Sequence, residues 1–582
     1  MKHSIVSALT VLTLAPATAL VAQVPPSGLD AAVIRSYVWP GAASEFTAAA
    51  ATLSTASWAR EVDQAAMDDL AEILREGPPA LDRTVPERGD SVNEMVVELA
   101  SGRRVPLWVR LPSDWTPDRH WPLMFAMHGG PPGSIEAAVN SGRRMISVWA
   151  EAAEAAGWIV ASPAMVDVVS RDGRTDDRLP YEIFQPEEAR EVVETVRRMY
   201  RVNPDRIVST GISLGSNFSI AYAAAYPDWL SGIVPVSTEG ESREHLLRNV
   251  ANTPVYVLEG SQDQNIRGVN GPRSMRDILN KFGNDLVYRE FGDRAHEGFP
   301  EHYPDVLSWL DARPRQKNPT EILRVPHAGI SGTSRTLHWI ESRDRQGVIR
   351  AGAERHEAAV GPNEVGTTIH IEARWTSGVR IYLNDQIANL DRPVRVIANG
   401  ASSVHYPTRS IEMALEIVRT RGDERLVFPV SLDVELPTGR ASVAAGETLW
   451  SELAPTYSEG VLSFWEMYAV RALQERFPNV GFSGTEVGMP VDTRTTAPEQ
   501  VALRVDSVSD DSPAAAAGLR RGDVLLNFGG EPFFRGRGGV TGLHHWLVRE
   551  LRTHPQSYEL IVWRDGERMV LTGSFSLGPY SG

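Results

Sequence analysis

The sequence of 582 residues contains no cysteine, and this absence excludes several kinds of chemistry. Disulfide bonds, thiol nucleophiles and cysteine-ligated zinc sites are impossible, so each domain must be held together by burial of an apolar core. The sequence also lacks an H-E-x-x-H motif and clustered His and Asp residues. Neither a metal nor another cofactor is therefore predicted.

An excess of basic residues is absent as well. The chain carries 58 Lys and Arg against 74 Asp and Glu, which gives a net charge of −16. Because a nucleic-acid-binding surface usually shows a basic excess, no nucleic-acid partner is expected.

Long apolar runs are rare, and the one that stands out covers residues 5–21 at the N-terminus. Small residues, Ala19 and Ala22, follow or end this run, which is typical of a secretory signal peptide over residues 1–22. A short membrane anchor is the alternative, but Pro16 and the lack of a stop-transfer flank favour cleavage. The mature chain is then expected in the bacterial periplasm or secreted, without a membrane span.

The remaining chain divides into regions of different periodicity. Residues 28–89 are Ala-rich and predict a helical N-terminal extension. Between 90 and 315, apolar runs typical of buried strands occur at 105–111, 123–127, 158–162, 207–210, 233–236, 255–258 and 286–291. Helical patterns separate them at 186–200, 214–226, 272–282 and 303–311. This alternation predicts an α/β fold with a doubly wound, mostly parallel sheet covered on both faces.

From 316 to 440 the pattern changes to strands with one apolar face. Ile369, Ile371 and Ala373 alternate with polar residues, which predicts half-buried antiparallel sheet. We expect a β-sandwich-like accessory domain with one helix near 410–420, followed by a linker and a helix over 441–479.

Residues 480–582 contain a specific signature. The segment 512–526 reads S-P-A-A-A-A-G-L-R-R-G-D-V-L-L, and it resembles the S-P-A-x-x-A-G-L-x-x-G-D motif of PDZ domains of bacterial envelope proteins. The resemblance implies a groove helix at 541–551 and strand-addition binding of a peptide C-terminus. The candidate carboxylate-binding loop consists of Gly481, Phe482, Ser483 and Gly484.

The strongest catalytic signal is the single G-x-S-x-G motif, G-I-S-L-G at 211–215. An apolar run precedes it and a helical run follows it, which is the strand–turn–helix context of the nucleophile elbow in α/β-hydrolases. The alternative is a flexible Gly/Ser loop, since the chain has 48 glycines. The context favours Ser213 as a nucleophile.

A serine needs a base and an orienting carboxylate, which follow it in the order Asp, His in this fold. Asp263 comes just after the predicted strand 255–258, and His296 comes just after 286–291. We therefore predict a Ser213, Asp263, His296 triad, with Asp293 as the main competitor for the acid and His302 as the nearest rival for the base.

An oxyanion requires backbone donors. The N–H of Leu214, next to the predicted nucleophile, is one candidate. The other is the loop H-G-G-P-P-G after the strand 123–127, where we expect Gly130 to donate, with Gly129 next. His128 is expected to fix this loop, and a Gly/Pro turn without function is the alternative.

Together, H-G-G at 128–130, G-I-S-L-G-S at 211–216, G-S-Q-D at 260–263 and A-H-E at 295–297 resemble secreted esterases related to polyhydroxybutyrate depolymerases and feruloyl esterases. The resemblance implies acyl-enzyme hydrolysis of a small-molecule or polymeric ester. Prolyl-oligopeptidase-type peptidases share the same core, and a PDZ domain would suit a peptidase that recruits peptide ends. A binding protein without catalysis is the third reading. The missing disulfides and the C-terminal PDZ signature depart from the esterase pattern.

Overall fold

The structure is a computed structural model of the chain. It describes residues 28–59, 62–79, 92–100, 102–130, 135–165, 184–241, 244–264, 270–326, 334–344, 347–361, 363–374, 376–436, 482–488, 500–510, 512–528, 531–534 and 558–573. The expected signal peptide, the 441–479 linker and helix, and the 541–551 helix lie outside these residues. Over the described residues, no helix has the length and apolar character that crossing a membrane requires.

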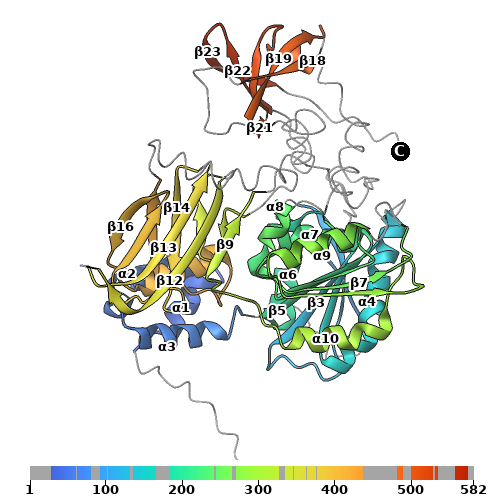
Figure 1. Cartoon of the computed structure of the whole chain (residues 1–582). Coiled ribbons are helices and arrows are strands. Elements are labelled where there is room, and N and C mark those ends of the chain that lie inside the picture. Colours follow the sequence, from blue (N-terminus) through green and yellow to red (C-terminus); the bar gives the residue numbers. More distant parts are fainter. Residues whose placement is uncertain are drawn as a thin grey trace, which may run out of the picture.

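The first large unit is built on an eight-stranded sheet with the order β1-β2-β4-β3-β5-β6-β7-β8 (Figure 1). Strand β2 is antiparallel to both β1 and β4. The strands β4, β3, β5, β6, β7 and β8 all run parallel to one another. The strands are β1 (Val92–Glu98), β2 (Arg104–Arg110), β3 (Trp121–Met127), β4 (Ile159–Pro163), β5 (Val202–Ile212), β6 (Gly232–Val236), β7 (Val255–Gly260) and β8 (Leu286–Phe291). The predicted parallel core is confirmed.

Helices cover both faces of this sheet, as the apolar runs require. Along β3, Phe125 belongs to one apolar cluster and Met124 to the other, because successive strand residues point to opposite faces. The helices on the Phe125 face are α6 (Pro186–Tyr200), α7 (Leu214–Ala225), α8 (Glu244–Asn249) and α9 (Asn270–Lys281). Those on the Met124 face are α4 (Ile135–Ala156) and α10 (Tyr303–Asp311). The stacked rings of Trp149 and Tyr303, with centroids 3.8 Å apart, join α4 to α10.

The next region forms two sheets around one apolar core. The first contains β10 (Thr336–Leu337), β11 (Ile340–Ser342), β14 (Gly378–Leu383) and β17 (Val430–Glu435). The second contains β16 (Ala401–His405), β15 (Val394–Ala398), β13 (Val365–Arg374), β12 (Val348–Val360) and β9 (Glu321–Arg324). Ile369 and Ile371 are buried while His370 is exposed, so the predicted alternation is confirmed. The expected helix is α11 (Ile411–Arg421).

The N-terminal helices pack against this β-rich region and not on the eight-stranded sheet. They are α1 (Ala31–Val38), α2 (Ala43–Thr55), the short η1 (Ser57–Ala59) and α3 (Gln64–Arg75). Ile34, Leu53 and Leu70 share one apolar cluster with Leu415 and Val418 of α11. The N-terminal segment therefore covers α11 and completes the β-rich unit, below its sheets in Figure 1.

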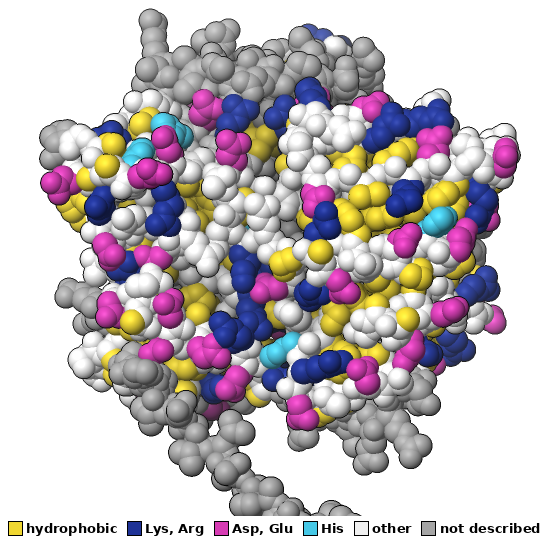
Figure 2. All heavy atoms as spheres, turned by 60° about the horizontal axis from the view of Figure 1, so that its bottom comes forward, with side chains coloured by type: hydrophobic (Ala, Val, Ile, Leu, Met, Phe, Trp, Pro, Cys, Tyr) yellow, Lys and Arg dark blue, Asp and Glu magenta, His cyan; other side chains and the backbone are white. Residues whose placement is uncertain are grey.

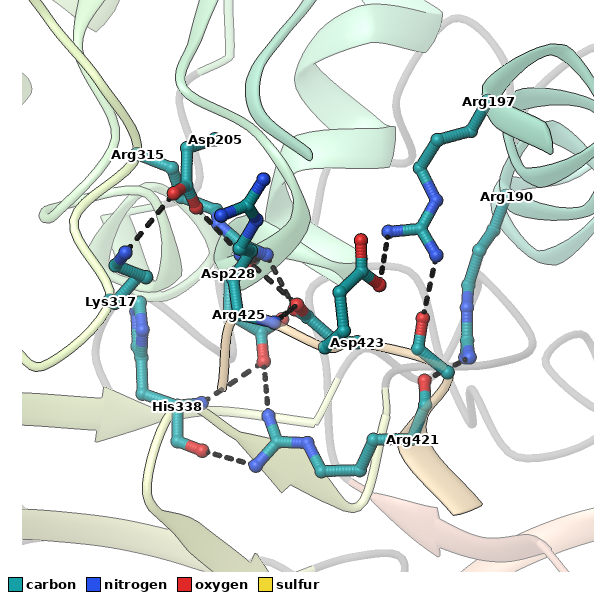
Figure 3. A network of polar contacts seen from close by, with 12 residues as sticks. Arg190, Arg197, Asp205, Asp228, Arg315, Lys317, His338, Arg421, Asp423 and Arg425 are labelled. Atoms are coloured by element: carbon teal, nitrogen blue, oxygen red, sulfur yellow. Dashed lines mark hydrogen bonds and ion pairs between the residues drawn. The ribbon is translucent and has the colours of Figure 1, made fainter. Parts of the chain in front are cut away.

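Buried ion pairs join the β-rich unit to the eight-stranded unit (Figure 3). Arg315 donates to Asp423 at 2.6 Å, and Arg197 of α6 donates to Glu424 at 3.0 Å. All four side chains are at most 3% exposed. Removing one member of such a pair would leave the buried charge of its partner less well compensated, so these contacts hold the two units together.

The C-terminal region is a six-stranded sheet with the order β18-β19-β21-β20-β22-β23. Its elements are β18 (Phe482–Gly488), β19 (Gln500–Val508), α14 (Pro513–Ala516), β20 (Val524–Phe528), β21 (Glu531–Phe534), β22 (Tyr558–Arg564) and β23 (Glu567–Gly573). Ser512 caps α14, and Asp523 accepts two hydrogen bonds from Arg564, at 2.6 and 2.7 Å.

The predicted carboxylate-binding loop differs from the structure in one respect. Phe482, Ser483 and Gly484 open strand β18 and are paired with β19, with a register shift between Ser483 and Gly484. Gly481 lies outside the described residues. These three positions are therefore strand and not loop, because the pairing with β19 begins at Phe482.

Candidate active site

Ser213 lies in a sharp turn between β5 and α7. Its backbone has φ 58° and ψ −120°, a region that costs a non-glycine residue about 1–3 kcal/mol. The two motif glycines explain how the turn closes. A Cβ on Gly211 would lie 2.2 Å from the carbonyl carbon of Gly215, and a Cβ on Gly215 would lie 2.3 Å from the carbonyl oxygen of Met127. Only glycine fits at either position, so the sequence motif encodes this turn directly.

Asp263 and His296 come together in the loops that follow β7 and β8. The His296 Nδ1 lies 2.8 Å from Asp263 Oδ2, within hydrogen-bond distance. The Asp263 side chain is 2% exposed, whereas that of His296 is 34% exposed. This geometry anchors one ring nitrogen on a buried carboxylate and leaves Nε2 available for proton transfer.

Glycine also allows these two loops to meet. A Cβ on Gly260 would lie 2.3 Å from the carbonyl oxygen of Ala295, directly before His296. On the other side, Ser237 Oγ, at the end of β6, donates to the Glu297 carbonyl at 2.6 Å and accepts from its N–H at 3.1 Å. The loop that carries His296 is therefore held from both neighbouring strands. It also reaches the serine turn, because a Cβ on Gly298 would lie 3.6 Å from Ile212.

Asp293 and His302, the alternative acid and base, make other contacts. Asp293 is exposed and accepts a hydrogen bond from Gln262 Nε2 at 3.1 Å. The His302 ring stacks on Phe291 with the ring centroids 4.2 Å apart. The pairing of Asp263 with His296 therefore favours these two residues over their rivals.

The H-G-G loop follows β3 and lies against the serine turn. A Cβ on Gly129 would be 3.0 Å from the Ile212 carbonyl oxygen and 3.4 Å from Ser213 Cβ, so the backbone approaches the serine closely. Gly130 has φ +116°, which favours glycine. Leu214 opens α7, where the first N–H groups have no partner within the helix. The candidate donors Leu214, Gly130 and Gly129 thus belong to the two segments nearest to Ser213.

His128 fixes this loop from within the core. Its Nδ1 lies 2.9 Å from the Gly129 carbonyl oxygen and its Nε2 lies 2.8 Å from that of Ala164. Burial lowers the pKa of His128, so the ring is neutral and donates to one of these carbonyls at neutral pH. This role agrees with the expectation from the sequence.

One residue of the site was not predicted. Glu259, at the end of β7, is fully buried and shares a hydrogen bond with Asp263. Burial, followed by the hydrogen bond and charge of Asp263, raises the pKa of Glu259 to about 9. A carboxyl residue in an otherwise apolar strand was the signal that could have drawn attention to it.

The strand order, the antiparallel second strand, and the order of serine, acid and histidine together define an α/β-hydrolase fold. No known family model matches the chain. A stretch of 143 residues, 24% of the chain, is 28% identical to "Putative esterase NocK" of Nocardia uniformis subsp. tsuyamanensis. This stretch spans 40% of that relative's length.

Solved structures with some similarity include two bacterial hydrolases. The S-formylglutathione hydrolase FrmB of Staphylococcus aureus aligns over 39% of this chain and 99% of its own, at 15% identity and a TM-score of 0.31. The poly(3-hydroxybutyrate) depolymerase LpqC of Bordetella parapertussis aligns over 39% of this chain and 92% of its own, at 14% identity and a TM-score of 0.29. The fold assignment itself rests on the strand order and on the geometry of the serine turn.

Proposed function

We propose that this protein is an exported serine hydrolase that cleaves carboxylic esters through an acyl-enzyme on Ser213. One observation supports the proposal above all others. A serine in a strained turn and a histidine hydrogen-bonded at 2.8 Å to a buried aspartate lie in loops at the same edge of the sheet. An activated hydroxyl of this kind suits attack on a carbonyl.

The proposed reaction has two halves. His296 Nε2 takes the proton of Ser213 while Oγ attacks the ester carbonyl, and the Leu214 and Gly130 N–H groups hold the oxyanion. The alcohol then leaves with the proton from His296, and an acyl-enzyme remains. Water, deprotonated by His296, releases the acid and restores the serine. Asp263 orients His296 and stabilises its cation throughout.

The substrate class is a small-molecule or polymeric ester, and the C-terminal region is proposed as a PDZ domain that binds a peptide C-terminus. The PDZ assignment is supported by the signature at 512–526. Ser512 and Asp523 of that signature each have a physical role, because Ser512 caps α14 and Asp523 pairs with Arg564. Export is supported by the N-terminal apolar run.

The test is hydrolysis of short p-nitrophenyl esters beside a panel of peptide p-nitroanilides. Ser213→Ala is expected to lower kcat by about 1,000-fold or more, because the nucleophile is lost. Ser403→Ala, on the exposed edge strand β16, is the matched control and keeps wild-type turnover. Ester turnover that survives in folded Ser213→Ala would contradict the proposal, and turnover of peptides alone would replace the esterase with a peptidase.

The assignment of the acid is tested by a second matched pair. Asp263→Asn removes the charge that orients His296 and should lower kcat by about 1,000-fold or more. Asp293→Asn alters an exposed side chain in the neighbouring loop and should leave kcat within about threefold. The reverse pattern would assign the acid to Asp293.

A further inference from the structure

Glu259 occupies an unusual position for an acidic side chain. The strand β7 is buried along its whole length, and Glu259 is 0% exposed. Its Oε2 accepts the Thr238 N–H at 3.0 Å, and its Oε1 accepts the Gly260 N–H at 3.3 Å. A buried carboxylate without a cation is costly, so a neutral, hydrogen-bonded carboxyl is the favoured form.

The side chain of Glu259 also shares a hydrogen bond with the Asp263 carboxyl group. Two buried carboxyls in contact cannot both be ionised cheaply, so the pair holds one proton over a wide pH range. Asp263 also accepts from His296 Nδ1 at 2.8 Å, and its charge is stabilised by that donor. The proton therefore resides on Glu259, whose pKa is raised to about 9, first by burial and then by Asp263.

We propose that Glu259 is a positioning residue for the reaction, which donates a hydrogen bond from its protonated carboxyl to Asp263 and thereby holds that carboxylate toward His296. This inference rests on the proposed function. Glu259 would thus be a fourth residue beside the proposed triad. The Asp263 carboxylate is then held between His296, in the loop after β8, and the neutral Glu259 on β7.

At alkaline pH the hydrogen bond from Glu259 to Asp263 is expected to be lost. When Glu259 loses its proton, Asp263 loses a donor and faces a second negative charge, so its orientation toward His296 is disturbed. Other ionisable groups face this region from the neighbouring strands and from α9. Burial and Glu290 raise the pKa of Tyr288 on β8, so the phenol stays neutral, and Glu290 remains paired with Arg273 of α9. From the β6 side, Glu239 also lies buried near Thr238.

The test is the rate at which a fluorophosphonate probe phosphonylates Ser213, followed by intact mass from pH 6 to 10. The probe needs no knowledge of the natural substrate, because Ser213 Oγ forms the P–O bond, fluoride leaves and His296 takes the proton. The wild-type rate is expected to fall about tenfold between pH 8 and 10 as Glu259 ionises.

Three variants test whether Glu259 positions Asp263. Glu259→Gln keeps an N–H donor and cannot ionise, so its rate at pH 7.5 should be within about threefold of wild type and its alkaline decline should be absent. Glu259→Leu removes the donor, so across the pH range its rate should stay about tenfold below the rate of the wild type at pH 7.5. Glu357→Gln neutralises an exposed acid on β12 and should follow the wild-type profile.

The outcomes separate this inference from the proposed function. If Ser213→Ala is labelled as fast as wild type, the proposed function itself fails. If Ser213→Ala is unreactive but Glu259→Gln shows the same alkaline decline as wild type, only the role of Glu259 is overturned. Should Glu259→Leu fail to fold, the near-isosteric Gln variant still decides between these results.

Discussion

Single residues set the geometry of this site, and glycines do so most clearly. Gly211 and Gly215 let β5, the serine turn and α7 approach within distances that no Cβ allows. Gly260 does the same between the loops that carry Asp263 and His296. These glycines thus explain the positions of Ser213, Asp263 and His296 in the candidate site.

At this scale, Gly260→Ala is predicted to impair catalysis strongly. Its Cβ would lie 2.3 Å from the Ala295 carbonyl oxygen, so the loop before His296 must move. We expect kcat/KM for a p-nitrophenyl ester to fall about tenfold or more. Gly292→Ala is the matched control, because its Cβ would meet no atom within 4 Å, and it should keep wild-type activity. Equal activity in the two variants would show that this close approach does not position His296.

The serine turn and the pairing of Asp263 with His296 could be predicted from the sequence because short motifs next to apolar strands encode them locally. The acidic residue Glu259 stands out in an apolar strand, but its contact with Asp263 could not be predicted, since that contact depends on how the chain turns after β7. The strand character of Phe482–Gly484 was not predicted for a related reason. Whether a Gly- and Ser-containing segment is loop or strand depends on a partner, and β19 pairs with it here.

At the scale of elements, the polar loop after α11 joins the two large units. Burial alone would raise the pKa of Asp423, but Arg315 and Arg197 hold it well below its usual range. Asp423 therefore contributes stability above pH about 4, and this contribution is lost as the pH falls through its lowered folded-state pKa.

Asp423→Ala is predicted to lower the free energy of unfolding by about 3 kcal/mol at pH 7, because Arg315 loses a buried counter-ion. Arg380 and Asp433 form an exposed pair on the surface of the β-rich unit, with side chains 47% and 51% exposed. Asp433→Ala is therefore the control and should cost less than about 1 kcal/mol. Urea unfolding measures the free energy of unfolding of both variants. Equal losses would show that the buried Arg315–Asp423 pair stabilises the protein no more than the exposed pair does.

The strands that were predicted well are the fully buried ones, since a short continuous apolar run is typical of a buried strand. Strand β1 was missed because it is an edge strand with mostly exposed or half-buried side chains, and its apolar residues do not stand out. Helix α4, with 22 residues, was missed because polar and apolar positions are mixed along its Ala-rich sequence. Edge strands and long surface helices are hard to recognise in the sequence, because their formation depends on the elements they pack against.

At the scale of the whole molecule, one face mixes its charges. Figure 2 shows basic and acidic side chains of the described residues interspersed over the face drawn, without gathering by sign. The sequence indicated helical structure at the N-terminus but not its place, because only the folded chain brings α1, α2 and α3 onto α11. The hydrophobic periodicity of a segment does not show which distant segment it packs against.

The modular arrangement predicts that removal of residues 480–582 leaves hydrolysis of small esters within about threefold of the full chain. The candidate site is built from residues 128–130, 211–215, 259–263 and 296–298, and the six-stranded C-terminal sheet has its own strand pairings. Steady-state kinetics of the truncated protein, with circular dichroism to establish folding, measures this. Loss of small-ester turnover in a folded truncation would mean that the C-terminal region completes the site.

Covalent labelling can determine whether Ser213 is the nucleophile. The protein would be treated with a fluorophosphonate, digested, and mapped by mass spectrometry, beside Ser213→Ala. The account predicts one adduct per chain, on the peptide that contains Ser213, and none in the variant. An adduct on another residue, or equal labelling of Ser213→Ala, would contradict it.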